Sequence, residues 1–133
     1  MPRKKLIKFS ALEKKLDTVF SRFIRLRDAD EGGTTECVTC QKLFFWKELD
    51  CGHFVKRQHR ATRWDERNTA PQCTRCNHFM GGRQDDFAVY IMRKYGSIAF
   101  TELMELKYKT VKHSRAELEE KIEHYGKLVK EMT

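Results

Sequence analysis

Residues 37–77 read CVTCQKLFFWKELDCGHFVKRQHRATRWDERNTAPQCTRCN and hold two Cys-x-x-Cys pairs, Cys37/Cys40 and Cys73/Cys76, with 32 residues between the pairs. A two-residue spacer in a tight turn lets both sulfurs of one pair bind the same tetrahedral ion at about 2.3 Å. Two pairs fill all four positions around zinc, and such a site is structural because no position remains for water or substrate. The sequence therefore predicts a structural zinc ion bound by these four cysteines, with free or redox thiols as the alternative.

The fifth cysteine, Cys51, has no place in that zinc site, so we expect a small buried residue on a strand. The chain has no apolar run near the roughly 20 residues of a membrane span. Its basic start lacks the apolar stretch of a signal peptide. We therefore expect a soluble protein that does not contact membranes and stays in a reducing cell interior, where cysteines bind metal more often than they form disulfides.

The sequence on either side of residues 37–77 has a helical period. Apolar residues recur at three- and four-residue steps from Phe9 to about Leu26, which predicts one long helix before Gly32-Gly33. Ser10 to Glu13 has capping-box spacing, while Phe9 indicates a hydrophobic staple or an earlier start. Three further helices are expected from Asp85 to Tyr95, from Ser97 to about Lys107, and from a capping box at Ser114-Arg115-Ala116-Glu117 to the C-terminus.

These patterns divide the 133 residues into three regions. We expect an N-terminal helical arm (1–33), a zinc-binding centre (34–84) and a C-terminal helical region (85–133). The class is therefore α+β, mostly helical outside the centre. With 40% hydrophobic and 35% charged residues the core is thin, so a metal is expected to stabilise the central region.

The positive charge is concentrated in the centre. The formal net charge is +8, and residues 37–83 hold nine basic and four acidic side chains, whereas residues 84–133 hold nine of each. Within twelve residues lie five basic side chains and an aromatic one: Lys56, Arg57, Arg60, Arg63, Arg67 and Trp64. Arginine forks bind phosphate oxygens in pairs, so this loop predicts nucleic-acid binding, with a solvated charged loop as the alternative.

Three residues between or beside the cysteine pairs have chemistry of their own. Asp50 and His53 lie three residues apart, and Asn77 follows Cys76 directly, so a zinc site would fix its backbone. Oxygen ligands such as those of Asp50 and Asn77 suit magnesium or manganese, and histidine suits a general base near neutral pH. Taken singly, the three are equally well a turn residue, a core histidine and a helix cap.

The order Cys-x-x-Cys, Asp-x-x-His, Cys-x-x-Cys-Asn resembles phage endonuclease VII, a Holliday-junction resolvase of the His-Me finger (HNH-like, ββα-metal) superfamily. A longer set of residues resembles the NinG (Rap) recombination family of lambdoid phages. The shared pieces are residues 50–54 (DCGHF), 61–68 (ATRWDERN) and 72–77 (QCTRCN). The resemblance covers about the central third of the chain.

The resemblance implies a zinc-stapled ββα-metal centre flanked by α-helices. Asp50 and Asn77 match the positions that bind the catalytic Mg²⁺ or Mn²⁺, His53 matches the general base, and Asn68 matches the asparagine that positions the loop. Cys51 stands where endonuclease VII has a second histidine, so no accessory role carries over to that position.

The implied function is a structure-specific, divalent-metal-dependent endonuclease that cleaves branched DNA such as Holliday junctions and D-loops. Its expected setting is the cytoplasm of a bacterial host, from a phage or prophage gene, with other recombination proteins as partners. A zinc-stabilised nucleic-acid-binding module without catalysis and a zinc-based protein-interaction module are the alternatives. Because four-way junctions have two-fold symmetry, we also expect a homodimer that exchanges or pairs its terminal helices, with packing inside one chain as the alternative.

Overall fold

The computed structural model describes residues 6–133, which form two helical layers around a small β-hairpin. The long helices are α1 (Phe9–Arg27), α3 (Gln84–Tyr95), α4 (Ser97–Leu106) and α5 (Arg115–Met132). The strands are β1 (Thr34–Glu36), β2 (Leu43–Phe45), β3 (Leu49–His53) and β4 (Thr69–Cys73). Short helical turns join them: η1 (Trp46–Glu48), α2 (Arg60–Arg63), η2 (Glu66–Asn68) and η3 (Arg75–Phe79). The expected α+β class is confirmed.

The helix ends follow their local sequences. The α5 helix begins with the predicted capping box, in which the Ser114 hydroxyl and the Glu117 carboxylate each accept from the other residue's backbone N–H. At the other end of the chain, α1 starts at Phe9 with no side-chain cap, so the expected alternative of an earlier start is confirmed and the capping box at Ser10 is wrong. Glu13 is buried against the loop after β3 and accepts a hydrogen bond from Arg60 Nε at 2.8 Å.

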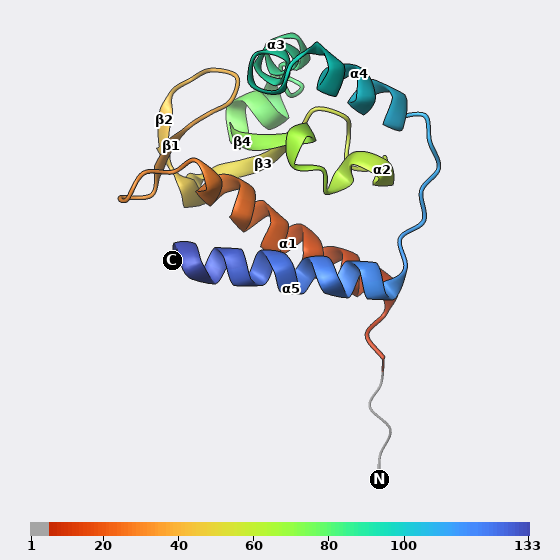
Figure 1. The fold of residues 1–133 in the computed structure, drawn as a ribbon. Coiled ribbons are helices and arrows are strands. Elements are labelled where there is room, and N and C mark those ends of the chain that lie inside the picture. Colours follow the sequence, from red (N-terminus) through yellow and green to blue (C-terminus); the bar gives the residue numbers. More distant parts are fainter. Residues whose placement is uncertain (1–5) are drawn as a thin grey trace.

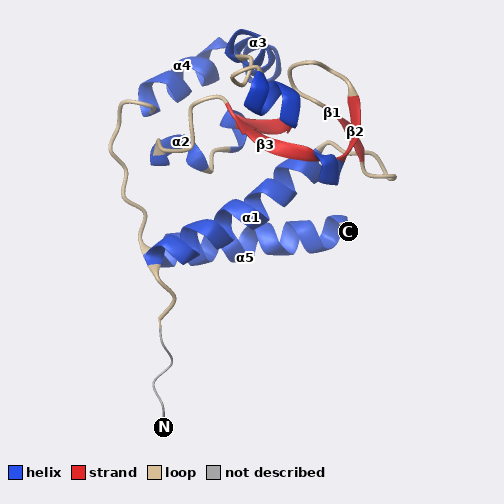
Figure 2. Cartoon of the chain, turned by 180° about the vertical axis from the view of Figure 1, so that it is seen from behind, coloured by secondary structure: helices blue, strands red, loops and turns tan. Residues whose placement is uncertain are grey.

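Helices α1 and α5 lie side by side in one layer, as both views show (Figures 1 and 2). Tyr125 of α5 packs its ring on Phe20 and Phe23 of α1, with ring centres 5.0 and 4.9 Å apart. The buried apolar cluster between the helices and the central loop comprises Leu12, Leu16, Phe20, Phe23, Ile24, Trp64, Leu118 and Tyr125. The apolar stripes of the two helices therefore cover each other within one chain.

The hairpin of β3 and β4 lies between that layer and the layer of α3 and α4 (Figure 2). The two strands are antiparallel, with Leu49 opposite Cys73 and His53 opposite Thr69. A second core cluster covers the other side and comprises Phe54, Val55, Ala70, Phe87, Ile91 and Leu103. Among residues 6–133, no helix is both long enough and apolar enough to cross a membrane.

Candidate functional site

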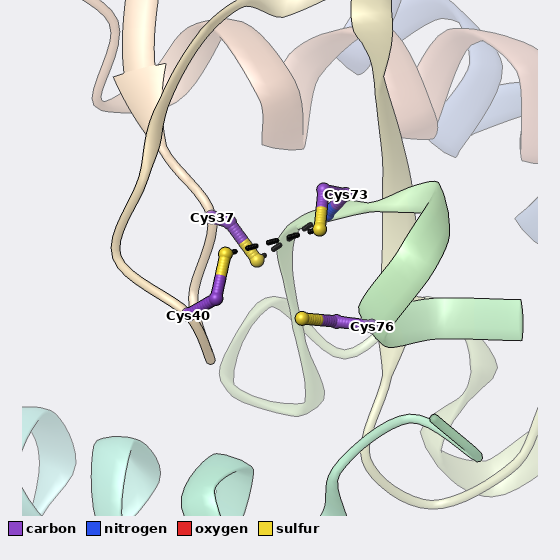
Figure 3. A group of neighbouring side chains, drawn as sticks. All are labelled: Cys37, Cys40, Cys73 and Cys76. Atoms are coloured by element: carbon purple, nitrogen blue, oxygen red, sulfur yellow. Dashed lines mark hydrogen bonds between the residues drawn. The ribbon is translucent and has the colours of Figure 1, made fainter. Parts of the chain in front are cut away.

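The four paired cysteines converge from two parts of the chain (Figure 3). Cys37 and Cys40 lie in the β1–β2 connection, Cys73 ends β4, and Cys76 lies in η3. Their sulfurs all lie within 4.8 Å of one another, and Cys40 Sγ is 3.8 Å from Cys73 Sγ. Sulfurs at 2.3 Å from one zinc ion stand about 3.8 Å apart, so this group has the size and the ligand chemistry of a zinc site.

The surroundings favour a thiolate at Cys37, whereas burial raises the pKa of Cys40 and raises that of Cys73 to about 12. The Cys73 backbone N–H donates to Cys37 Sγ at 3.3 Å, and Arg83 Nη1 lies 3.9 Å from Cys76 Sγ. Burial raises the pKa of Cys37, but donation from the Cys40 and Cys73 backbones and from Thr39 outweighs it and lowers that pKa to about 6. Since zinc binds the deprotonated form, these donors prepare Cys37 for a metal, and a bound cation would itself favour the thiolates of Cys40 and Cys73.

The cysteine group brings Asn77 to the β3 strand. Asn77 lies in η3, immediately after Cys76, and its Nδ2 donates to Asp50 Oδ2 at 3.2 Å. His78 Nε2 lies 3.3 Å from the same carboxylate oxygen. The two oxygen-bearing side chains that the sequence singled out, Asp50 and Asn77, are therefore in contact although 27 residues separate them.

A close approach inside the hairpin explains one glycine of the central stretch. A Cβ on Gly52 would stand 2.5 Å from Oε1 and 2.9 Å from Cβ of the buried Gln72. Gln72 Nε2 donates to Thr39 Oγ1 at 3.1 Å and to the Gly82 carbonyl at 2.8 Å. Gln72 thus ties the first cysteine pair to the segment after η3, and only glycine at position 52 leaves room for it.

His53 ends β3 and is held by its Nε2, which lies 2.9 Å from the Arg63 carbonyl oxygen. A carbonyl oxygen only accepts, so Nε2 carries the hydrogen and the neutral ring has its lone pair on Nδ1. Burial lowers the pKa of His53, against the backbone carbonyls of Arg63 and Cys51 that favour the charged ring. The neutral imidazole therefore predominates at neutral pH.

One cleft of about 540 Å³ contains these groups. It lies between α1 and β3, and residues of η1 and of the loop after β3 also line it. Its lining residues are Asp17, Phe20, Ser21, Arg25, Lys47, Leu49, Asp50, Cys51, His53, Lys56, Arg57 and Asn77. The carboxylate, imidazole and amide predicted from the sequence thus share one cleft with several cations.

Asn68 is fully buried and supports the loop after His53. Its Oδ1 accepts from the Val55 N–H at 2.7 Å, and its Nδ2 donates to the carbonyls of Val55 and Thr62 at 3.0 and 3.2 Å. These three bonds fix the start and the middle of the loop relative to β4. The position is that of a residue that orients the backbone and does not line the cleft.

Of the six residues expected to contact DNA, Lys56 and Arg57 are exposed and line the cleft. Arg57 also lies 3.8 Å from Asp17 Oδ2, but its side chain stays largely exposed. The other four are held more firmly by partners inside the protein. Arg60 pairs with Glu13, and Arg63 donates to Asp17 with Nε at 3.1 Å. Arg67 pairs with Asp65 and Glu102, which raise its pKa. Trp64 is buried, and its Nε1 donates to Asp17 at 3.0 Å. The structure therefore does not bring these four to the cleft.

Cleft residues that the sequence reasoning missed are Asp17, Arg25 and Lys47. A signal for Asp17 exists in the sequence. Glu13 and Asp17 lie four residues apart and so share one face of α1, opposite the arginines of the 56–67 loop. Arg25 and Lys47 have no such signal, because each is an ordinary charge until the cleft is formed.

Cys51 lies on β3, as expected, and packs against the α1–α5 cluster, but it is half-buried and not fully buried as the sequence predicted. Burial raises the pKa of its thiol to about 12. It therefore stays protonated at neutral pH and is a poor metal ligand or nucleophile.

A comparison with protein families matches residues 2–133 to the family described as Bacteriophage Lambda NinG protein. No curated protein and no solved structure matches the chain. The family match covers the helices as well as the cysteine-bearing centre.

Proposed function

Because the chain belongs to the bacteriophage lambda NinG family, we propose that it is a structure-specific DNA endonuclease of the His-Me finger type that cleaves branched recombination intermediates. Holliday junctions and D-loops are the proposed substrates. The observation that carries the proposal is the single cleft that holds Asp50, His53 and Asn77 beside Lys56 and Arg57. A module that only binds DNA has no need for this combination.

The hairpin β3–β4 followed by η3 has the order of a ββα-metal centre. In the proposed reaction His53 Nδ1 takes the proton of a water molecule that attacks the phosphodiester in line. The Arg63 carbonyl holds the other ring nitrogen and so fixes both the tautomer and the orientation of the imidazole. Breaking the bond between phosphorus and O3′ leaves a 5′-phosphate, and the departing 3′ oxygen takes a proton from solvent to become a 3′-hydroxyl.

Asp50 and Asn77 fit a magnesium or manganese ion by their donor chemistry, since carboxylate and amide oxygens are preferred ligands of these cations. The Asn77 amide needs only a half-turn of its terminal group to present its oxygen beside Asp50 Oδ2. When bound, such a cation supplies positive charge to the phosphate and the departing oxygen. Lys56 and Arg57 add phosphate contacts that position the DNA backbone.

The proposal includes two chains acting on one four-way junction, because resolution needs two cuts related by two-fold symmetry. The apolar stripes of α1 and α5 give no reason for a dimer, since they cover each other within one chain. We therefore expect two chains to assemble on the DNA. Other recombination proteins remain proposed partners.

A cleavage assay tests the function directly. A labelled four-way junction, a splayed arm, a D-loop and plain duplex are incubated with the protein and Mg²⁺, Mn²⁺ or no divalent cation. We expect cleavage of branched DNA well above that of duplex, and only with a divalent cation. Tight binding of junctions with no cleavage under any of these conditions would instead identify a non-catalytic nucleic-acid-binding module.

A further inference from the structure

Arg25 of α1 lies in the cleft without a carboxylate partner. Among residues 6–133, no aspartate or glutamate lies within salt-bridge distance of its guanidinium. Burial disfavours the charged form and lowers the pKa of Arg25. Most other arginines of this region, such as Arg63 and Arg67, have one. A partly buried cation without a counter-ion, in a cleft open to solvent, is suited to an anion from outside the protein.

The guanidinium of Arg25 is held in place by neutral groups. Its Nε donates to the carbonyl and the hydroxyl of Ser21 at 3.2 and 3.1 Å, and its Nη1 donates to the Trp46 carbonyl at 3.4 Å. Its centre lies 5.0 Å from the centre of the Trp46 ring. Within residues 6–133, its Nη2 has no hydrogen-bond partner. The group is therefore oriented but still has donors to offer.

A second cation accompanies it. Lys47 Nζ lies 5.6 Å from the centre of the same Trp46 ring, and Lys47 also lines the cleft. The Trp46 ring thus contacts both cations, Arg25 from α1 and Lys47 from η1. Lys47 precedes β3 in the chain, whereas Lys56 and Arg57 follow it, so these cations lie near opposite ends of the strand that bears Asp50 and His53. Arg25 lies with Lys47, because both contact the Trp46 ring.

We propose that Arg25 and Lys47 form a phosphate-binding subsite of the cleft, which holds the DNA backbone at the opposite end of β3 from Lys56 and Arg57. This inference rests on the proposed function, because the anion is a backbone phosphate of the substrate. A DNA strand that runs along β3 meets one pair of cations before Asp50 and His53 and the other pair after them. The subsite thereby fixes the phosphate between them relative to His53.

Binding measured without divalent cation separates this subsite from catalysis. Fluorescence anisotropy with a labelled four-way junction is recorded at several salt concentrations for wild type, Arg25→Ala, Lys47→Ala and Arg22→Ala. Arg22 is the matched control, since it removes the same charge from an exposed position of α1 outside the cleft. We expect Arg25→Ala to weaken binding about tenfold or more and to reduce the slope of log K against log salt by about one unit.

Lys47→Ala is expected to show the same kind of loss, and because Lys47 is exposed, this variant keeps the test informative if Arg25→Ala fails to fold. Junction affinity and salt slope equal to wild type in Lys47→Ala and in a folded Arg25→Ala would overturn the subsite, even if the protein cleaves DNA. Equal losses in Arg22→Ala would also overturn it, since general charge would then explain the effect. Losses confined to Arg25 and Lys47 in a protein that cleaves nothing would support the subsite and reject the nuclease.

Discussion

His53 combines two features that a general base needs near neutral pH. Its pKa is lowered by burial, and its Nε2 is occupied by the Arg63 carbonyl, so the neutral ring presents Nδ1 to a proton. Replacement by alanine is expected to reduce the rate of junction cleavage by about 10²–10⁴-fold. Junction affinity should change little, since a general base acts on the transition state more than on the bound substrate. Single-turnover cleavage and anisotropy measure the two quantities separately, and near wild-type cleavage by His53→Ala would show that another group is the base.

The lowered pKa of His53 also sets the pH dependence of the reaction. Cleavage requires the neutral ring, so kcat/KM should rise with pH, and the midpoint of this rise should lie below the ordinary histidine pKa of about 6.5. Folding stability shares this direction, because the unfolded chain binds more protons than the folded one between the two pKa values, and acid therefore destabilises the fold in that window. A pH–rate profile whose acidic limb has its midpoint above pH 7 would contradict the assignment.

Asp50 is expected to bind the divalent cation, and the variant Asp50→Ala tests this role. Asp50→Ala removes the carboxylate that contacts both Asn77 and His78. We expect it to lose cleavage and to require a much higher Mn²⁺ concentration for any residual activity, since it weakens cation binding. Titration of activity with Mn²⁺ separates it from His53→Ala, whose cation requirement should stay at the wild-type value.

At the level of single residues, the sequence was sufficient for groups defined by chemistry and spacing. The four cysteines come together as their spacing predicted. Asp50 contacts Asn77, whose backbone the sequence placed directly after the last cysteine. Arg63 and Trp64 did not follow their expected exposure, because Asp17 on α1 accepts from both of them. Whether an arginine meets phosphate or an internal carboxylate depends on the partner that the fold brings, and the local sequence does not contain that information.

The group of four cysteines determines the position of a whole element, η3. It joins the β1–β2 connection to β4 and η3, and Asn77 follows the last ligand directly. Removal of zinc by a strong chelator, or the change Cys76→Ser, is therefore expected to unfold the centre and abolish cleavage, although zinc touches no substrate. Elemental analysis should find about one zinc per chain. Cys51→Ala is the matched control and should keep the metal; a fold that persists after chelation would contradict the prediction.

The contact between α1 and the loop after β3 depends on Asp17. Asp17→Ala leaves the largely buried guanidinium of Arg63 and the Trp64 Nε1 without their common acceptor. We expect a loss of about 1–3 kcal/mol in the free energy of unfolding. Cleavage should also fall, because the Arg63 carbonyl orients His53. Urea unfolding measures the first effect, and Asp85→Ala, at an exposed position of α3, provides the control.

The helical elements were predictable because their signals are local. Period and capping gave α3, α4 and α5 to within a residue or two, and the Ser114 box formed as expected. The Ser10 box did not form because α1 already begins at Phe9, so Ser10 lies inside the helix, and the Glu13 side chain accepts from Arg60, 47 residues away. Contacts between residues far apart in the chain are likewise absent from the local signals of α1 and α5. The sequence therefore did not decide whether these two helices pack on each other within one chain or between two chains.

For the molecule as a whole, the packing of α1 on α5 predicts a monomer in the absence of DNA. Sedimentation equilibrium at micromolar concentration should give a mass near 15.9 kDa. With a four-way junction added, two chains per junction are expected, because paired cuts need two clefts. A complex that stays at one chain per junction at saturation would remove the basis for paired cutting.

The contact of α1 with α5 also has a consequence for the order in which the protein acquires its structure during synthesis. Arg115 donates to the Ile7 carbonyl at the start of both helices, while Tyr125 meets Phe20 and Phe23 further along, so the two helices run in the same direction. At bacterial and eukaryotic elongation rates, roughly 5–20 s pass between the completion of α1 and that of α5. During that interval the apolar stripe of α1 lacks its cover. Nascent chains should therefore need a chaperone or a provisional contact, and the cleft wall built by α1 becomes stable only after translation has passed α5.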